Sequence, residues 1–140
     1  MRFKLRSIKP GQAEFVGNRR AGQPYKKLAL IIKDEGWWHY STTDEHADEF
    51  GHLPDFTYEW RTRRECFEWL ARWVLKRQAE RALEGGRGLS RVFFHCPCRD
   101  ALSDMRESGL FTSAELHDWR EKMEASGRET EWKPKQKEGS

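Results

Sequence analysis

The chain has 140 residues, a length that suits one domain with a single hydrophobic core. Charged residues make up 35% of it but nearly balance, to a net charge of +3, so the total charge by itself does not indicate nucleic-acid binding. No apolar run is as long as a membrane span, the N-terminal residues lack the apolar centre of a signal peptide, and three cysteines form a poor disulfide framework. We therefore expect a soluble protein of the reducing cytoplasm.

Strand patterns dominate the first part of the chain. Phe3 and Leu5 alternate with basic residues, which is typical of a half-exposed strand, and the apolar and aromatic runs on either side of the turn KDEG predict a β-hairpin. The segment 17–24 contains two glycines, an asparagine and a proline and predicts a loop. The predicted strands are residues 2–8, 26–32, 37–42, 56–60 and 91–94.

A long helix is predicted from Thr62 to about Glu84. Thr62 is a suitable N-cap with Glu65 three residues on, and the helix should stop at Gly85 and Gly86. At helical spacing, one broad apolar arc contains Cys66, Phe67, Trp69, Leu70, Ala71, Trp73, Val74 and Leu75. We expect this arc to lie on the sheet.

A second helical region follows near the C-terminus. A helix over 99–108 should end at Gly109, and Thr112 with Glu115 forms the capping box of the next helix. The segment ALSDMRESGLFTSAELHDWREKM, residues 101–123, resembles the short helical hairpins, SHOCT-like, that are appended to many bacterial proteins. The resemblance implies a helical hairpin that serves in association, and it implies no catalytic activity.

Together these patterns predict an α+β fold. An antiparallel sheet of four to five strands is packed by one long helix, and a helical hairpin completes the C-terminal part. We expect one domain over residues 1–126, which includes the hairpin at 101–123, followed by a polar tail at 127–140.

Charge is segregated along the chain. Residues 1–33 contain nine Lys and Arg but one acid, a net charge of +8, whereas residues 34–59 contain eight acids and no Lys or Arg. Residues 61–91 carry a net charge of +5, and residues 92–140 a net charge of −2. Two interpretations of the acidic stretch stay open: its acids pair with Lys26, Lys27 and their neighbours, or the stretch protrudes as a patch that meets a basic partner.

The second interpretation predicts a protein-binding surface. Its acidic part is the loop 44–55, and Trp38, on the opposite strand face from Trp37 and beside Tyr40, is the candidate exposed aromatic anchor. The candidate partner-binding residues are Trp38, Tyr40, Asp44, Glu45, Asp48, Glu49 and Asp55.

A nucleic-acid surface is the alternative. The core-facing stripe of the long helix turns basic at Arg77 and Arg81, which either are solvated or face a partner. With the basic loop 17–27 and the helix end 76–81, the candidate phosphate-contacting residues are Arg19, Arg20, Lys26, Lys27, Lys76, Arg77 and Arg81. No recognised nucleic-acid-binding motif accompanies them.

Metal binding is a third hypothesis. The ligand types in the acidic stretch, His39, His46, Asp48, His52 and Asp55, match no familiar zinc spacing. A stronger group is His95, Cys96 and Cys98, with Cys66 as a possible fourth ligand. Cysteines that pack as small buried apolar groups explain the same pattern, and we favour that interpretation over zinc.

No signature of nucleophilic, phosphate-binding or paired-carboxylate catalysis is present in the sequence. We therefore expect a non-catalytic protein-binding module without a cofactor, an inhibitor or adaptor. One example of this class is a phage or mobile-element inhibitor of a host defence complex such as CRISPR-Cas. The alternatives are a nucleic-acid-binding protein and a small zinc-dependent enzyme.

Overall fold

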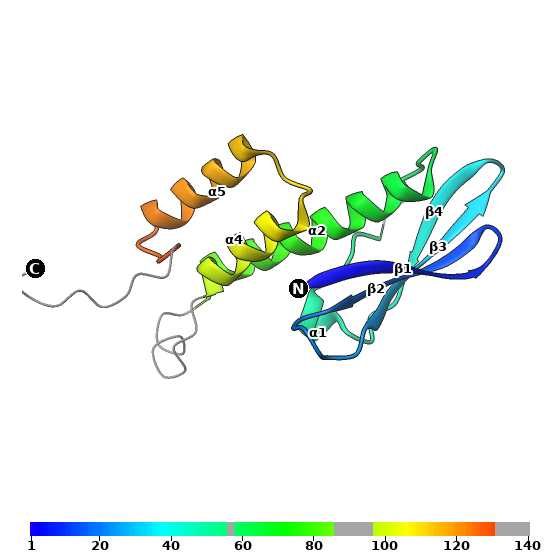
Figure 1. The fold of residues 1–140 in the computed structure, drawn as a ribbon, viewed down its shortest axis with the longest axis horizontal. Helices are drawn as coiled ribbons and strands as arrows, with labels where there is room; N and C mark the ends of the chain where they lie inside the picture. The colour runs from blue at the N-terminus through cyan, green and yellow to red at the C-terminus, as the bar shows by residue number, and fades with distance from the viewer. Residues whose placement is uncertain (56–57, 86–96, 131–140) are drawn as a thin grey trace, which may run out of the picture. The chain divides into compact units, whose positions relative to one another are not determined.

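The computed structural model describes residues 1–55, 58–85 and 97–130 (Figure 1). Its elements are β1 (Arg2–Lys9), β2 (Gln12–Asn18), β3 (Lys26–Asp34), β4 (Trp37–Thr42), α1 (Ala47–Phe50), α2 (Arg63–Glu84), α4 (Pro97–Ser108) and α5 (Ser113–Ala125). The chain divides into two compact units, unit 1 (residues 1–78) and unit 2 (residues 79–140), and α2 contributes residues to both. The antiparallel sheet, the long helix and the C-terminal hairpin confirm the predicted α+β fold.

The four strands form one antiparallel sheet in the order β1-β2-β3-β4 (Figure 1). Pro10 and Gly11 connect the first two strands, and the positive φ of Gly11, 80°, suits the third position of a type II turn. Glu35 and Gly36 connect β3 to β4, both with positive φ, as in the type I′ turn whose twist matches a hairpin. Tight turns therefore connect two of the three strand pairs.

One side of the sheet packs against α2 through Phe15. Its side chain is fully buried, its ring stacks on Phe3 at 5.3 Å between centroids, and it meets the edge of the Phe67 ring from α2 at 5.7 Å. Gly17 makes room for this stack, because a Cβ there would lie 2.8 Å from the Phe3 ring. Full burial of one large apolar side chain contributes about 1.5–3 kcal/mol to the free energy of unfolding, so this layer is a major source of stability.

An aromatic cluster extends the same layer toward β4. The Tyr40 ring lies 5.8 Å from Trp60 and 5.9 Å from Trp69, and Trp69 stacks on Trp73 at 5.5 Å. Tyr58 lies 5.2 Å from Trp69. Aromatic pairs at these distances add stability beyond the area that they bury.

The predicted ends of the long helix are confirmed. The Glu65 backbone N–H donates to the Thr62 hydroxyl at 3.1 Å, which caps the first turn. The helix ends at Glu84, and the Gly85 N–H donates to the Arg81 carbonyl. The buried residues of the predicted arc are Cys66, Phe67, Leu70, Ala71, Val74 and Leu75.

Unit 2 contains the predicted helical hairpin, in which α4 packs on α5. Gly109, with a φ of 70°, follows α4. The capping box is confirmed: the Glu115 N–H donates to the Thr112 hydroxyl at 3.1 Å, and the Thr112 N–H donates to the Glu115 carboxylate at 3.0 Å. Met105 of α4 and Met123 of α5 are fully buried.

The first residues of the predicted polar tail are ordered parts of unit 2. The Arg128 guanidinium donates to the Leu83 carbonyl at 3.0 Å and to the Gly85 carbonyl at 2.7 Å. These carbonyls belong to the end of α2, where the last turn leaves acceptors without helical donors. Arg128 therefore caps the C-terminal end of α2.

Two strand predictions need correction or fall outside the structure, and one strand was not predicted. The strand expected at 56–60 is reduced to a bridge between Trp60 and Trp38, while Phe56 and Thr57 lie outside the described residues. The strand expected at 91–94 also lies outside them. The actual additional strand is β2, which extends into the predicted loop 17–24 as far as Asn18.

The domain boundaries stay a prediction. Compactness separates residues 1–78 from 79–140, whereas one domain over 1–126 was expected. Within the described ranges, none of the helices combines the length and apolar composition needed to cross a membrane.

Candidate protein-binding site

The acidic segment, residues 43–55, leaves β4 and returns toward α2 through the single turn of α1. Burial and two hydrogen bonds anchor it to the rest of unit 1. Phe50 is buried, the Tyr40 hydroxyl donates to the Pro54 carbonyl at 2.7 Å, and the Trp73 indole N–H donates to the His52 carbonyl at 3.2 Å. Because the two donors come from β4 and α2, the segment is fixed to the sheet and helix of unit 1.

Two carboxylates of the segment are strongly exposed. The Asp44 side chain is 77% exposed, and its Oδ1 lies 3.2 Å from Nδ1 of His52. The Glu45 side chain is 76% exposed and lies 3.9 Å from Nε2 of His46. Each of these two carboxylates therefore has an imidazole of the same segment beside it, and the contact is an ion pair only when that imidazole is protonated.

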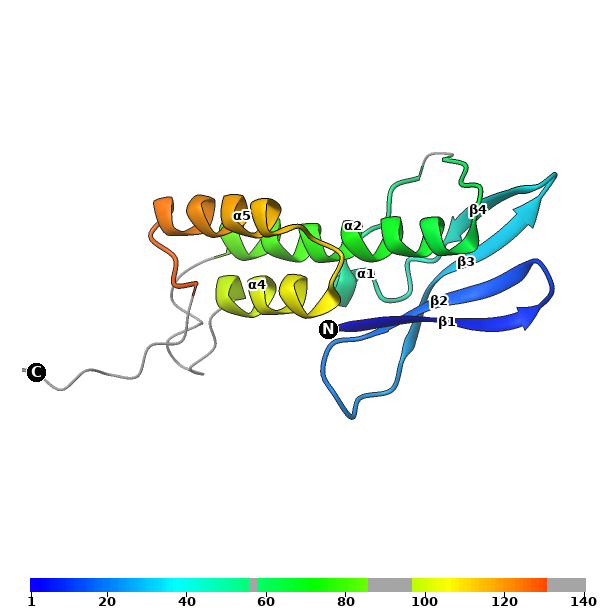
Figure 2. The ribbon, with the colours of Figure 1, turned by 45° about the horizontal axis from the view of Figure 1, so that its top comes forward.

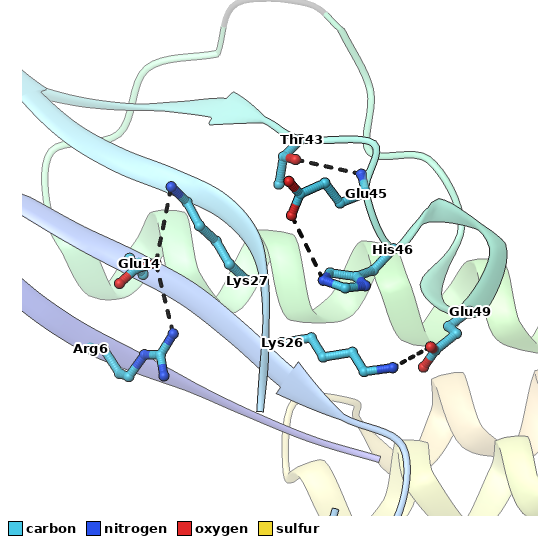
Figure 3. Close-up of polar contacts among 8 residues, drawn as sticks. All are labelled: Arg6, Glu14, Lys26, Lys27, Thr43, Glu45, His46 and Glu49. Atoms are coloured by element: carbon cyan, nitrogen blue, oxygen red, sulfur yellow. Dashed lines mark hydrogen bonds and ion pairs between the residues drawn. The ribbon is translucent and has the colours of Figure 1, made fainter. Parts of the chain in front are cut away.

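Glu49 differs from Asp44 and Glu45, because it pairs with a lysine, Lys26 at the start of β3 (Figure 3). The hydrogen bond from Lys26 lowers the pKa of the Glu49 carboxyl. Lys27 reaches the other side of the strand, where it lies 4.0 Å from Glu14, which also pairs with Arg6 at 3.7 Å. Neutralisation of the acidic segment by the basic strands, one of the two interpretations of the sequence, is thus observed at Glu49.

The remaining candidate acids, Asp48 and Asp55, are exposed. Asp48 lies in α1, next to Glu49, and Asp55 follows Pro54. With Asp44 and Glu45, they give the segment four exposed carboxylates on a short, anchored piece of chain. Such an arrangement produces a negative field that attracts basic partners.

The candidate aromatic anchor, Trp38, lies on the side of β4 that faces α2. Tyr40 packs against Trp69 of α2, so the strand face that it shares with Trp38 is the face toward the helix. Trp38 is half-buried there, and its backbone N–H and C=O bond to Trp60. Burial also raises the pKa of the Tyr40 hydroxyl to about 12. Trp37 lies on the opposite face of the strand, beside Arg61.

The basic residues proposed for nucleic acid occupy different environments. Arg19 and Arg20 are exposed in the loop after β2, whereas Lys26 and Lys27 are ion-paired on β3. The candidates on α2 divide between the units: Lys76 and Arg77 belong to unit 1 and are half-buried, and Arg81 belongs to unit 2 and is exposed.

The metal candidates are only partly visible. His95 and Cys96 lie outside the described residues. Cys66 and Cys98 are buried, and burial raises the pKa of the Cys66 thiol to about 12, which opposes the thiolate form that zinc binds. In the ranges 1–55, 58–85 and 97–130, no three His, Cys, Asp or Glu side chains are grouped to hold a metal ion.

The sequence interpretation overlooked the cluster of Arg6, Glu14 and Lys27 on the sheet (Figure 3). It depends on β2, which was not predicted, although the Pro-Gly turn after the alternating run of β1 is a hairpin signal.

Comparison of the chain with protein-family models, curated proteins and solved structures finds no match.

Proposed function

We propose that the chain is a non-catalytic protein-binding module and that the acidic segment, residues 43–55, binds a basic surface of another protein. The observation that carries this proposal is the pair Asp44 and Glu45, whose exposed carboxylates are held on an anchored segment. Charges placed in this way accelerate association with a partner of opposite sign and select against partners of the same sign.

An anchored segment also lowers the cost of binding. Phe50 and the hydrogen bonds from Tyr40 and Trp73 order the chain before a partner arrives. Less conformational entropy is then lost in the complex than for a free acidic loop. A module of this kind acts by covering or bridging its partner, as inhibitors and adaptors do; inhibition of a host defence complex such as CRISPR-Cas by a phage or mobile-element protein is one activity of this class.

The test is quantitative capture from nuclease-treated cell lysate with matched variants. The first variant carries Asp44→Lys and Glu45→Lys and leaves the Glu49–Lys26 pair intact. The control carries Asp118→Lys and Glu121→Lys on α5, both at exposed positions, so that its net charge changes equally. We expect a protein that the wild type and the control capture and that the acidic-segment variant loses.

Kinetics with the captured protein then distinguish charge steering from loss of folding. The acidic-segment variant should associate more slowly, by about tenfold or more at low salt, with an unchanged melting temperature. Salt should reduce the difference between the variants, because it screens exposed charges. Equal capture by all three proteins would contradict the proposal.

A further inference from the structure

The side of the sheet that faces away from α2 carries the second organised surface of unit 1. Strand register places its residues in rows, because cross-strand partners share a face. The rows are Lys9-Gln12-Ile32-His39, Arg6-Glu14-Leu30-Ser41, Lys4-Val16-Lys27 and Arg2-Asn18. Val16 and Asn18 are buried, so Lys4, Lys27 and Arg2 are the accessible residues of the last two rows. Trp37 and Asp34 continue the surface at the β3–β4 turn. We call this surface the outer sheet face.

The helix-facing rows lie on the opposite side. They contain Phe15, whose ring meets Phe67 of α2, and Tyr40, whose ring meets Trp69 of α2. In Figure 2, the first turns of α2, which belong to unit 1, lie on one side of the strands. The acidic segment also lies on the α2 side, since it bonds to Tyr40 and Trp73. The outer sheet face is therefore distinct from the acidic segment.

The outer sheet face is basic. Its cations are Arg2, Lys4, Arg6, Lys9, Lys27 and Arg61, and its acids are Glu14 and Asp34. Glu14 is shared between Arg6 and Lys27, at 3.7 Å and 4.0 Å, so one carboxylate holds two cations side by side (Figure 3). The Arg6 and Lys27 side chains are nevertheless 47% and 42% exposed. This surplus of positive charge suits a partner with regularly spaced negative charges.

Aromatic rings lie among these cations. The Arg61 guanidinium sits 4.9 Å from the centre of the Trp37 ring, and the Lys4 ammonium sits 4.1 Å from the centre of the Tyr25 ring. Trp37, Tyr25 and His39 are all half-exposed. An aromatic ring can stack on an unpaired base, and a cation beside it can bind the phosphate of the same strand.

We propose that the outer sheet face binds single-stranded nucleic acid, with Arg6, Lys27 and Lys4 at the phosphates and Trp37, Tyr25 and His39 stacking on bases. A duplex does not suit the rings of this surface, because paired and stacked bases are not free to stack on them. Four strands spaced about 4.8 Å apart give a width that accommodates about two or three stacked bases.

The test measures binding of a fluorescein-labelled oligouridylate to the full chain by anisotropy over a range of salt. Arg6→Gln with Lys27→Gln removes two phosphate contacts, and the matched control is Arg64→Gln with Arg106→Gln, exposed positions on α2 and α4. In a plot of log affinity against log salt, the slope for the sheet variant should become less steep by about 0.7 per lost contact, while the control keeps nearly the wild-type slope.

Trp37→Ala tests stacking and should weaken binding by about tenfold or more. His39→Ala is the second stacking variant if Trp37→Ala does not fold, as judged by its melting curve. An abasic oligomer of the same length should bind more weakly than oligouridylate, because it offers phosphates without bases.

Several results would overturn the proposal. One is the absence of binding at low salt, and another is equal slopes for the sheet variant and its control. Equal affinity for oligouridylate and the abasic oligomer would identify a surface for any polyanion. Preference for a duplex, or complete competition by polyglutamate, would identify a different partner. Reversal of Asp44 and Glu45 should leave oligouridylate affinity intact, so this inference and the proposed function fail independently.

Discussion

The acidic segment and the outer sheet face are charged regions of unit 1 that are built in opposite ways. On the sheet, strand register fixes each charge, so Arg6, Glu14 and Lys27 meet across three strands. In the acidic segment, Glu45 and Asp44 instead interact with histidines of the same short stretch, His46 and His52. Regular backbone pairing therefore organises the basic charges, whereas a short anchored loop presents the acidic ones.

The two regions nevertheless depend on each other at two places. They meet at the ion pair of Lys26 and Glu49, at the point where β3 begins. Both also rest on the layer of aromatic side chains under α2, which supports the sheet through Phe15 and the segment through Tyr40. Removal of a whole ring from the shared layer should affect both regions, whereas loss of a single contact to one region should spare the other.

Phe15→Ala should have the largest effect and should break both regions together. Phe15 is fully buried between Phe3 and Phe67, and removal of a buried phenyl ring costs about 3–5 kcal/mol of the free energy of unfolding. Denaturant unfolding measures this loss. Ile8→Ala is the control, since Ile8 is 51% exposed in the same sheet and its loss should change stability by less than about 1 kcal/mol. Similar values for the two variants would contradict this view of the core.

Tyr40→Phe should loosen the acidic segment and spare the outer sheet face. It removes the hydrogen bond to the Pro54 carbonyl, which contributes about 0.5–1.5 kcal/mol. Hydrogen exchange should rise in residues 43–55 and stay unchanged in β1 and β2. Uniform acceleration of exchange across the sheet would show that Tyr40 supports the whole unit.

The same residue gives a pH dependence. Burial raises the pKa of Tyr40 from 10.0 to about 12, so the folded state holds the phenol proton more tightly than the unfolded chain. Its contribution to stability is complete below pH 10.0 and is lost as the pH rises toward 12. Tyr40→Phe should remove this part of the alkaline loss, which melting curves over that range can measure.

Glu35→Asn should stabilise the sheet by a smaller amount. Glu35 has a φ of 51° in the β3–β4 turn, a conformation that asparagine before glycine adopts at lower cost. We expect a gain of about 0.5–1 kcal/mol in the free energy of unfolding. Asp34→Asn is the matched control, because it removes the same charge from the neighbouring strand residue without relief of a positive φ. Equal gains would mean that charge, and not backbone strain, is responsible.

Glu49→Gln should have the smallest effect and tests the link between the regions. Lys26 lowers the pKa of Glu49 below 4.5, so the pair stabilises the folded state above that pH, and the contribution is lost as the pH falls through the lowered pKa. The melting temperature of Glu49→Gln should depend less on pH in this acidic range than that of the wild type. Glu45→Gln, next to His46, is the control and should keep the wild-type acid dependence.

Local sequence signals determined much of the architecture. Thr62 and Thr112 cap helices as predicted, because a cap depends on residues three positions apart. The apolar arc of α2 and the β3–β4 hairpin were also readable from periodicity and a turn. The segregation of charge between residues 1–33 and 34–59 is a property of the sequence itself.

Tertiary structure alone decided how those parts face each other. In β4, Trp37, Trp38 and Tyr40 are all aromatic, so alternation could not tell which side meets α2, and the packing of Tyr40 on Trp69 decides it. Lys26 and Lys27 are adjacent in sequence but point to opposite sides of β3, so one pairs with Glu49 and the other with Glu14. These partners are distant along the chain, and only the strand register and the path of the acidic segment bring them within reach of an ion pair.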